Sequence, residues 1–321
     1  MGIRTPFAER FSLTYPIMLA PMGGIAGGRL AAAVSNAGGL GLVGGGYGDL
    51  EWLEAELALA REGTRRPWGV GVITWHAGIE AVKLALRFRP DVFFLSFGDP
   101  RPFAALIKDA GCALICQVQD VDAAQQAKAA GADVIVAQGT EAGGHGAVRA
   151  VLPLVPSVAD AVAPTPVLAA GGISEGRGLA AALMLGAQGA VVGTRFYACQ
   201  ESLGHPSAKR RIVGADGGDT VRTHMFDVVR GYAWPAPFTG RALRNRFTAR
   251  WAGRDDELAR SLDEERPRYQ AAAAAGDFET AVVWAGEGVD LIADVPSAAE
   301  IVQRIGREAE RRLGMASGLI V

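Results

Sequence analysis

Short apolar runs recur roughly every 20 to 27 residues through the first two thirds of the chain, as βα units do. The runs are rich in Val, Ile and Leu and show no alternation between apolar and polar positions. This pattern is typical of strands that are buried on both faces in a parallel sheet. The sequence therefore predicts eight strands, at residues 16–22, 40–45, 68–74, 91–97, 113–118, 133–139, 166–172 and 189–196.

Helical patterns separate these runs, and several of them end in glycine, the residue expected just after a helix. Clear examples are residues 28–38, 50–62, 120–131 and 176–186. Eight parallel strands with helical crossovers close into a (β/α)₈ TIM barrel, which is the predicted fold of this α/β protein. The alternative is an open, doubly wound sheet, which more often stops at five or six strands.

The regular alternation ends near residue 197, and this change predicts the domain organisation. Residues 1–203 are predicted to form the barrel. Residues 204–280 are richer in charge and are predicted to form a helical insert or cap over the barrel mouth near the C-terminus. Residues 281–321 return to apolar sequence and rejoin the barrel, with an amphipathic closing helix at 296–313.

Composition and charge narrow the class of protein. The 321 residues are half hydrophobic, and 32 Lys and Arg balance 34 Asp and Glu, so no basic surface for nucleic acid is expected. The three cysteines lack metal-site spacing, which predicts no metal site, no disulfide framework and a reducing compartment. The sequence has no secretory signal and no long apolar span, so we expect a cytoplasmic, soluble protein without membrane contact. The sequence does not decide whether the protein forms a homo-oligomer.

Glycine clusters follow five of the predicted strands. In a TIM barrel the loops after the strands carry the active site, so the five clusters share one face. Tight turns alone can require glycine, and this explanation suffices for the cluster after the second strand. Five clusters together predict a flat ligand lying against bare backbone. They occupy residues 21–28, 44–49, 141–146, 171–178 and 193–196.

The clusters after the seventh and eighth strands are the most informative, because barrels commonly bind phosphate there through backbone amides. The segments 171–173 and 193–195 supply such amides. Ser174 could either cap the next helix or reach the phosphate, and Arg195 could either pair with phosphate or form a structural salt bridge. The cluster after the second strand does not have the spacing of a dinucleotide-binding fingerprint.

Six segments then carry a resemblance to a known family: YPIMLAPMGG, AAAVSNAGGLG, QGTEAGGHG, LAAGGISEGRG, GAQGAVVGTRF and VWAGEGVDLI. In this order they resemble the nitronate monooxygenases, formerly called 2-nitropropane dioxygenases. Relatives of that family include flavin-type enoyl-acyl carrier protein reductases and certain NADH:quinone reductases. The resemblance covers roughly residues 12 to 310. It implies a (β/α)₈ barrel that holds FMN without a covalent link.

The resemblance also implies positions for the two ends of the cofactor. It places Pro21, Met22 and Gly23 against the isoalloxazine ring. The phosphate is expected on the glycines after the seventh and eighth strands. The corresponding residues are Gly171, Gly172, Gly193 and Thr194.

His145 is the predicted catalytic base, because the family's histidine in the EAGGH stretch stands over the flavin. Independently, a histidine at the C-terminal end of a strand titrates near neutral pH and can accept a proton. Gly143 and its neighbours are expected to let the backbone pass close to ring and substrate. His76, His205 and His224 lack such a setting and are predicted to be surface or structural residues.

Two positions depart from the commoner family pattern. After GVGV, many relatives continue with Asn and an apolar run, whereas this chain has Ile-Thr-Trp-His at residues 73–76. Gln117 lies where some relatives place a lysine beside the flavin. We expect Thr74 and Gln117 to contact the cofactor. An amide can hydrogen-bond the pyrimidine edge but supplies no positive charge to a reduced flavin, which leaves electron acceptor and substrate open.

Three hypotheses for function follow. The first is an FMN-dependent nitronate monooxygenase that oxidises alkyl nitronates or nitroalkanes with O₂ to carbonyl compounds, with His145 removing the α-proton or pairing with the nitronate. The alternative is an NAD(P)H-dependent FMN reductase acting on a quinone or an enoyl thioester. The third, a non-catalytic flavin-binding or assembly protein, is disfavoured by the intact histidine and phosphate-binding glycines.

Overall fold

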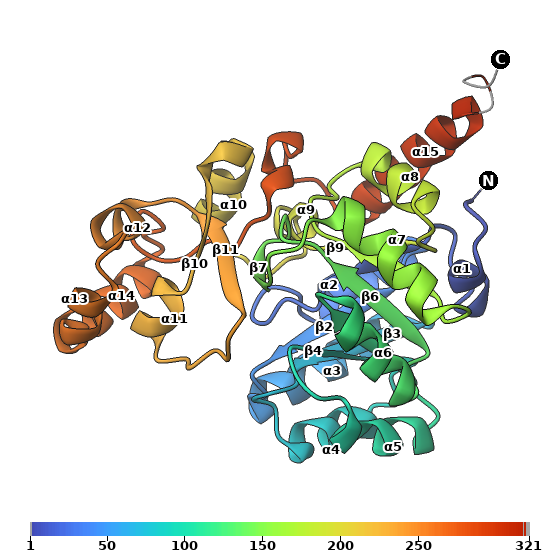
Figure 1. Cartoon of the computed structure of the whole chain (residues 1–321), viewed down its shortest axis with the longest axis horizontal. Coiled ribbons are helices and arrows are strands. Elements are labelled where there is room, and N and C mark those ends of the chain that lie inside the picture. The colour runs from blue at the N-terminus through green and yellow to red at the C-terminus, as the bar shows by residue number, and fades with distance from the viewer. Residues whose placement is uncertain (1, 317, 319–321) are drawn as a thin grey trace.

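Eight parallel strands form a barrel, as predicted (Figure 1). The computed structural model describes residues 2–316 and 318, so residues 317 and 319–321 of the C-terminal segment lie outside the described residues. The strand order is β1-β9-β8-β6-β5-β4-β3-β2, and a parallel bridge between Met18 and Leu40 closes the barrel. The strands are β1 (Ile17–Leu19), β2 (Gly41–Gly46), β3 (Trp68–Ile73), β4 (Val92–Ser96), β5 (Ala113–Val118), β6 (Val134–Gln138), β8 (Val167–Ala170) and β9 (Ala190–Val192).

The strands lack alternation because both of their faces are buried. In β4, Phe94 packs in the barrel interior with Met18 and Ile115. Its neighbours Phe93 and Leu95 pack outward against the surrounding helices. The continuous apolar runs therefore reflect two hydrophobic layers that share one ring of strands.

Helices cover the outside of this ring (Figure 1). The short N-terminal helix contributes Phe7 to the interior cluster, and the C-terminal helix packs against α8 and α2. The helices of the barrel are α1 (Pro6–Arg10), α2 (Gly28–Asn36), α3 (Leu50–Gly63), α4 (Ile79–Arg87), α5 (Arg101–Asp109), α6 (Val121–Ala129), α7 (Val151–Val162), α8 (Gly176–Met184), α9 (Thr194–Tyr197) and α15 (Ala298–Ala316).

The segment after α9 projects to one side of the barrel (Figure 1). It contains five α-helices and also two strands that the sequence did not predict. These strands pair with each other, and β11 also pairs with β7 (Gly144–Gly146) to make a three-stranded antiparallel sheet. The elements are α10 (Pro206–Val213), η1 (Gly217–Asp219), β10 (Thr220–Thr223), α11 (Met225–Arg230), β11 (Thr239–Leu243), α12 (Arg246–Trp251), α13 (Asp255–Arg260), α14 (Leu262–Ala275) and η2 (Glu287–Leu291).

Over residues 2–316 and 318, no helix is both long and apolar enough to cross a bilayer. Within the same residues, no three His, Cys, Asp or Glu side chains gather as a metal site requires. Cys112, Cys116 and Cys199 are buried free thiols.

Candidate active site

A cavity of about 510 Å³ lies at the carboxyl ends of the barrel strands, between the barrel and the insert. Its volume is within the range of small-molecule and cofactor sites. All five glycine clusters contribute residues to its lining. Of the residues predicted from the sequence, the cavity is lined by Pro21, Met22, Gly23, Gln117, Gly143, His145, Gly171, Gly172, Gly193 and Thr194.

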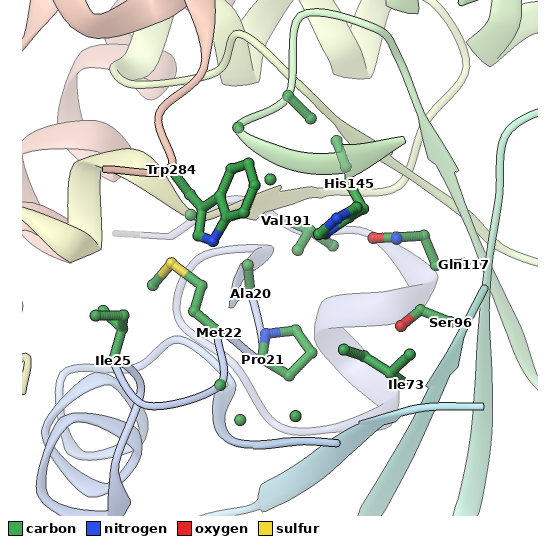
Figure 2. A pocket seen from close by; sticks show the side chains of 18 of the residues that line it. Ala20, Pro21, Met22, Ile25, Ile73, Ser96, Gln117, His145, Val191 and Trp284 are labelled. Atoms are coloured by element: carbon green, nitrogen blue, oxygen red, sulfur yellow. The ribbon is translucent and has the colours of Figure 1, made fainter. Parts of the chain in front are cut away.

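Thr74 is the predicted site residue that the structure does not bring to the cavity. It lies one position beyond β3, where its backbone N–H donates to the carbonyl of Ser96 at 2.8 Å. Its side chain packs toward Gly98, and its buried hydroxyl has no hydrogen-bond partner among the described residues. Ile73, the last residue of β3, faces the cavity instead (Figure 2).

The loop after β1 forms one side of the cavity, with Pro21 and Met22 side by side (Figure 2). Glycines on the neighbouring strands make room for this loop. A Cβ on Gly71 would lie 2.5 Å from the Pro21 ring, and one on Gly44 would lie 2.3 Å from the Met22 carbonyl carbon. Gly44 of β2 and Gly71 of β3 therefore serve close packing within the protein, a role that differs from the tight turn expected for the second cluster.

The loops after β8 and β9 lie side by side because these strands are neighbours in the barrel. Gly171 and Gly172 have φ values of 113° and 68°, a backbone region that favours glycine. Gly193 precedes α9, and a Cβ there would make only ordinary contacts, with Ala20 Cβ at 3.4 Å and Met22 Sδ at 3.6 Å. A Cβ on Gly193 would therefore not clash with the protein, and Gly193, Ala20 and Met22 all line the cavity.

The sequence left two possible roles for each of Ser174 and Arg195. Ser174 is buried, lines the cavity and does not cap α8, whose N-cap is Glu175. The buried guanidinium of Arg195 binds the Asp294 carboxylate at 3.0 Å and also donates to the carbonyl oxygens of Ala198 and Asp294. Arg195 is therefore a structural ion-pair residue, and it does not line the cavity.

His145 lies in β7 and is held from both sides. Its strand pairs with β11, where Gly240 lies opposite His145. The side-chain amide of Gln138 donates to the His145 carbonyl oxygen at 3.0 Å, and Gln119 in turn donates to Gln138 at 2.8 Å. The side chain points from β7 toward Gln117, at the end of β5 (Figure 2). The insert thus fixes the histidine over the barrel mouth.

The imidazole of His145 contacts a carboxylate that the sequence did not reveal. Its Nε2 lies 2.8 Å from Oδ2 of Asp227 in α11, and both side chains are buried. Because an ionised carboxylate only accepts hydrogen bonds, Nε2 is assigned the proton and Nδ1 keeps the lone pair. Among the described residues Nδ1 has no hydrogen-bond partner, which leaves it available to a ligand in the cavity.

The surroundings keep this histidine neutral. Burial lowers the pKa of His145 from its usual 6.5, and the nearby charges of Arg230 and Arg222 act in the same direction. The hydrogen bond and the charge of Asp227 oppose this shift. The net direction is downward, so the imidazole is available as a base at neutral pH.

Aromatic rings enclose His145 on the insert side. Trp234 stacks on the imidazole with a centroid distance of 3.5 Å and an interplanar angle of 5°, and Trp284 lies tilted at 5.0 Å. The Trp234 indole N–H donates to the Tyr47 hydroxyl at 2.9 Å, and burial raises the pKa of that phenol to about 12. Tyr47 also stacks on Tyr232. These rings shield the histidine from water.

The three remaining histidines lie away from the cavity lining, as predicted. His76 is exposed, with Nδ1 at 3.0 Å from the Tyr47 carbonyl oxygen. The side chain of His205 caps α10, and that of His224 is 51% exposed. None of the three has the buried, paired setting of His145.

Comparison with known proteins identifies the family. The model of the nitronate monooxygenase family matches residues 4–80 and 75–308. The chain belongs to the nitronate monooxygenase family. It is 35% identical to a nitronate monooxygenase of Neurospora crassa, over 92% of this chain and 89% of that protein.

Two further similarities show how wide the nitronate monooxygenase family is. The chain is 32% identical, over the full length of both proteins, to a (3aS,4S,5R,7aS)-5-hydroxy-7a-methyl-1-oxo-octahydro-1H-indene-4-carboxyl-CoA dehydrogenase of Mycobacterium tuberculosis. It superimposes on FabK from Thermotoga maritima with a TM-score of 0.89 and 31% identity, covering 99% of this chain and 100% of that one. These relatives make the chain an oxidoreductase of a flavoprotein family with a TIM-barrel fold.

Proposed function

We propose that the protein is an FMN-dependent nitronate monooxygenase that oxidises alkyl nitronates or nitroalkanes with O₂ to carbonyl compounds. The observation that carries this proposal is the buried pair of His145 and Asp227 at the cavity. Such a pair orients a neutral imidazole with one nitrogen free, which is the state required to remove a proton from carbon.

The backbone of the cavity supports the assignment of FMN. The left-handed conformation of Gly171 and Gly172 and the lack of a side chain on Gly193 would allow a phosphate to approach backbone amides. Pro21 and Met22 would flank the ring, and the Gln117 amide would meet its polar edge. When bound, FMN supplies the transfer of electrons from the substrate to O₂.

The side chains around His145 have separate parts in the proposed reaction. Nδ1 of His145 takes the α-proton of a neutral nitroalkane. Asp227 keeps the proton on Nε2 and stabilises the imidazolium that forms. Trp234 and Trp284 limit the access of water to the imidazole. A preformed nitronate has already lost its α-proton, so it requires less of His145.

The second candidate function is an NAD(P)H-dependent FMN reductase acting on a quinone or an enoyl thioester. The similarity to a carboxyl-CoA dehydrogenase over the full length of both chains favours it. The two functions differ in the source of electrons, since a reductase takes them from the nicotinamide and the monooxygenase takes them from the nitronate.

Anaerobic mixing of the purified holoenzyme distinguishes them. We expect a yellow protein that releases FMN, and no FAD, on denaturation. Its flavin absorbance should bleach with the nitronate of 1-nitropropane and persist with NADH or NADPH. Bleaching by a reduced nicotinamide alone would instead establish the reductase. Colourless protein that does not bind added FMN would refute the cofactor assignment. The cytoplasmic location and a homo-oligomeric state stay predictions.

A further inference from the structure

Arg230 is the one Arg or Lys among the described residues that line the cavity. It ends α11, one turn after Asp227, so both side chains project toward His145. Its guanidinium lies 4.8 Å from the centre of the Tyr232 ring and 6.0 Å from that of Trp284, and the side chain is 25% exposed. This cation therefore lies at the same end of the cavity as the proposed base.

The guanidinium of Arg230 makes no hydrogen bond to any described residue, and its nearest carboxylate oxygen, Oδ1 of Asp227, lies 3.9 Å away. That distance is too long for a hydrogen bond. Three other largely buried arginines near the cavity each donate at least two hydrogen bonds to the protein. Arg195 binds Asp294, Arg222 binds the carbonyls of Thr140 and Thr239, and Arg241 binds Thr140 and Thr220.

A guanidinium that is three-quarters buried and has no hydrogen-bond acceptor from the protein is costly unless water or a ligand supplies acceptors. Its planar fork of N–H donors matches a planar anion with two oxygens. The charges around His145 are close to balanced, because Asp227 lies beside Arg230 while Glu141 and Glu287 lie near Arg222 and Arg241. It is therefore the free N–H donors of Arg230, rather than an excess of positive charge, that offer hydrogen bonds to an anion.

We propose that Arg230 binds the anionic end of the substrate, a planar group with two oxygens that is either the nitronate itself or a carboxylate carried by the substrate. This inference rests on the proposed function only if the anion is the nitronate, and not if it is a carboxylate of the substrate. The tilted Trp284 borders both Arg230 and His145, so an anion on Arg230 would place the adjoining carbon within the same enclosed end of the cavity.

The test measures equilibrium binding of butanoate to the FMN-loaded protein at pH 8, where His145 is neutral. Butanoate is an unreactive anion with the shape of the nitronate of 1-nitropropane, and butanamide is its uncharged match. Arg230→Met should weaken butanoate binding about tenfold to a hundredfold, as expected for loss of a charge-assisted pair of hydrogen bonds. Arg230→Lys should recover part of this loss, and butanamide binding should change little.

Arg260→Met provides the matched control, because Arg260 lies in α13, outside the cavity, and the substitution changes net charge equally. It should leave butanoate binding unaltered. Unchanged butanoate binding in Arg230→Met, or an equal loss in Arg260→Met, would overturn the inference. Loss of FMN from Arg230→Met would also overturn it, by assigning the residue to the cofactor.

Steady-state kinetics then separates the two sources of the anion. If Arg230→Met raises the KM of simple nitronates, the nitronate binds Arg230. If butanoate binding is lost while the KM of simple nitronates is unchanged, Arg230 binds a substrate carboxylate instead. Because butanoate binding needs no turnover, the inference survives even if the protein oxidises no nitronate, and the two proposals fail independently.

Discussion

The two walls of the cavity are built in different ways. The barrel wall is formed by strand ends and glycine loops, and it presents backbone and apolar side chains such as Pro21 and Val191. The opposite wall is formed by the insert, and it presents Asp227, Arg230 and Trp234 around His145. In the proposed function the barrel wall holds the cofactor and the insert wall sets the reactivity of the base.

The contrast extends to the glycines. A Cβ on Gly143 would lie 2.6 Å from the backbone of Ala285 and Gly286, so this glycine serves contact between two protein segments. A Cβ on Gly193 would meet only ordinary neighbours and would occupy space beside the cavity. Glycines in clusters that look alike in the sequence therefore have opposite roles, and substitution can tell them apart.

The largest effect is expected for His145→Ala. Turnover of a neutral nitroalkane should fall by about 10²–10⁴-fold, the usual contribution of a general base. FMN should be retained, because the phosphate loops lie on other strands. Oxidation of a preformed nitronate should suffer less, and steady-state rates with both substrates measure the difference.

The pH dependence gives an internal check on His145. The base is active when neutral, so the wild-type rate with a nitroalkane should rise with pH and level off above the pKa of His145. Since burial lowers that pKa, the midpoint should lie below 6.5. Equal losses on both substrates, or a flat profile with chemistry rate-limiting, would mean that His145 is not the base.

Gly193→Val should weaken FMN binding by about a hundredfold or more, because its branched side chain blocks hydrogen bonds between amides and phosphate. The fold should persist, since a Cβ at this position meets no protein atom closer than 3.4 Å. Gly143→Ala is the contrasting variant. There we expect a loss of about 1–3 kcal/mol in the free energy of unfolding from overpacking.

FMN titration and thermal unfolding of both variants measure this contrast between the two glycines. Full FMN occupancy in Gly193→Val would place the phosphate elsewhere. A Gly143→Ala protein that is as stable as wild type in the absence of FMN would show that the contact with Ala285 and Gly286 relaxes without cost.

Asp227→Asn tests whether the insert wall tunes the base. The amide retains the shape but can donate to Nε2 and so favour the tautomer with a proton on Nδ1. Nitroalkane turnover should fall about tenfold to a hundredfold, as is typical when the partner of a functional histidine is altered. The pH midpoint should also move down, because Asp227 raises the pKa of His145. A fall in rate without this shift would indicate a structural role only.

The barrel could be predicted from the sequence because its signals are local. Each strand is a short apolar run, and all eight predicted runs overlap a barrel strand. The six motifs that resemble the family likewise named residues at the cavity. Thr74, which lies outside those motifs, does not line it. There the prediction failed by one position, since Ile73 ends β3 and faces the cavity.

The insert wall could not be predicted because its contacts join distant segments. Residues Asp227 and His145 are 82 positions apart, and nothing in a run of charged helical sequence marks one aspartate among many. Strand β7 has three residues, two of them glycine, and forms only because β11 pairs with it. Trp284 did lie in a recognised motif, VWAGEGVDLI, which could have flagged it.

The smallest effect is expected for Trp234→Ala, which removes the ring stacked on His145. Burial is the largest cause of the lowered pKa of His145, so admitting water should raise that pKa toward 6.5. We expect the nitroalkane rate to be about threefold lower on the acid side of the profile, with little change at pH 8. The pH profiles of the wild type and the variant measure it. A downward shift would instead show that the indole face stabilises the protonated imidazole, and that the insert wall acts on the base through its rings as well as through Asp227.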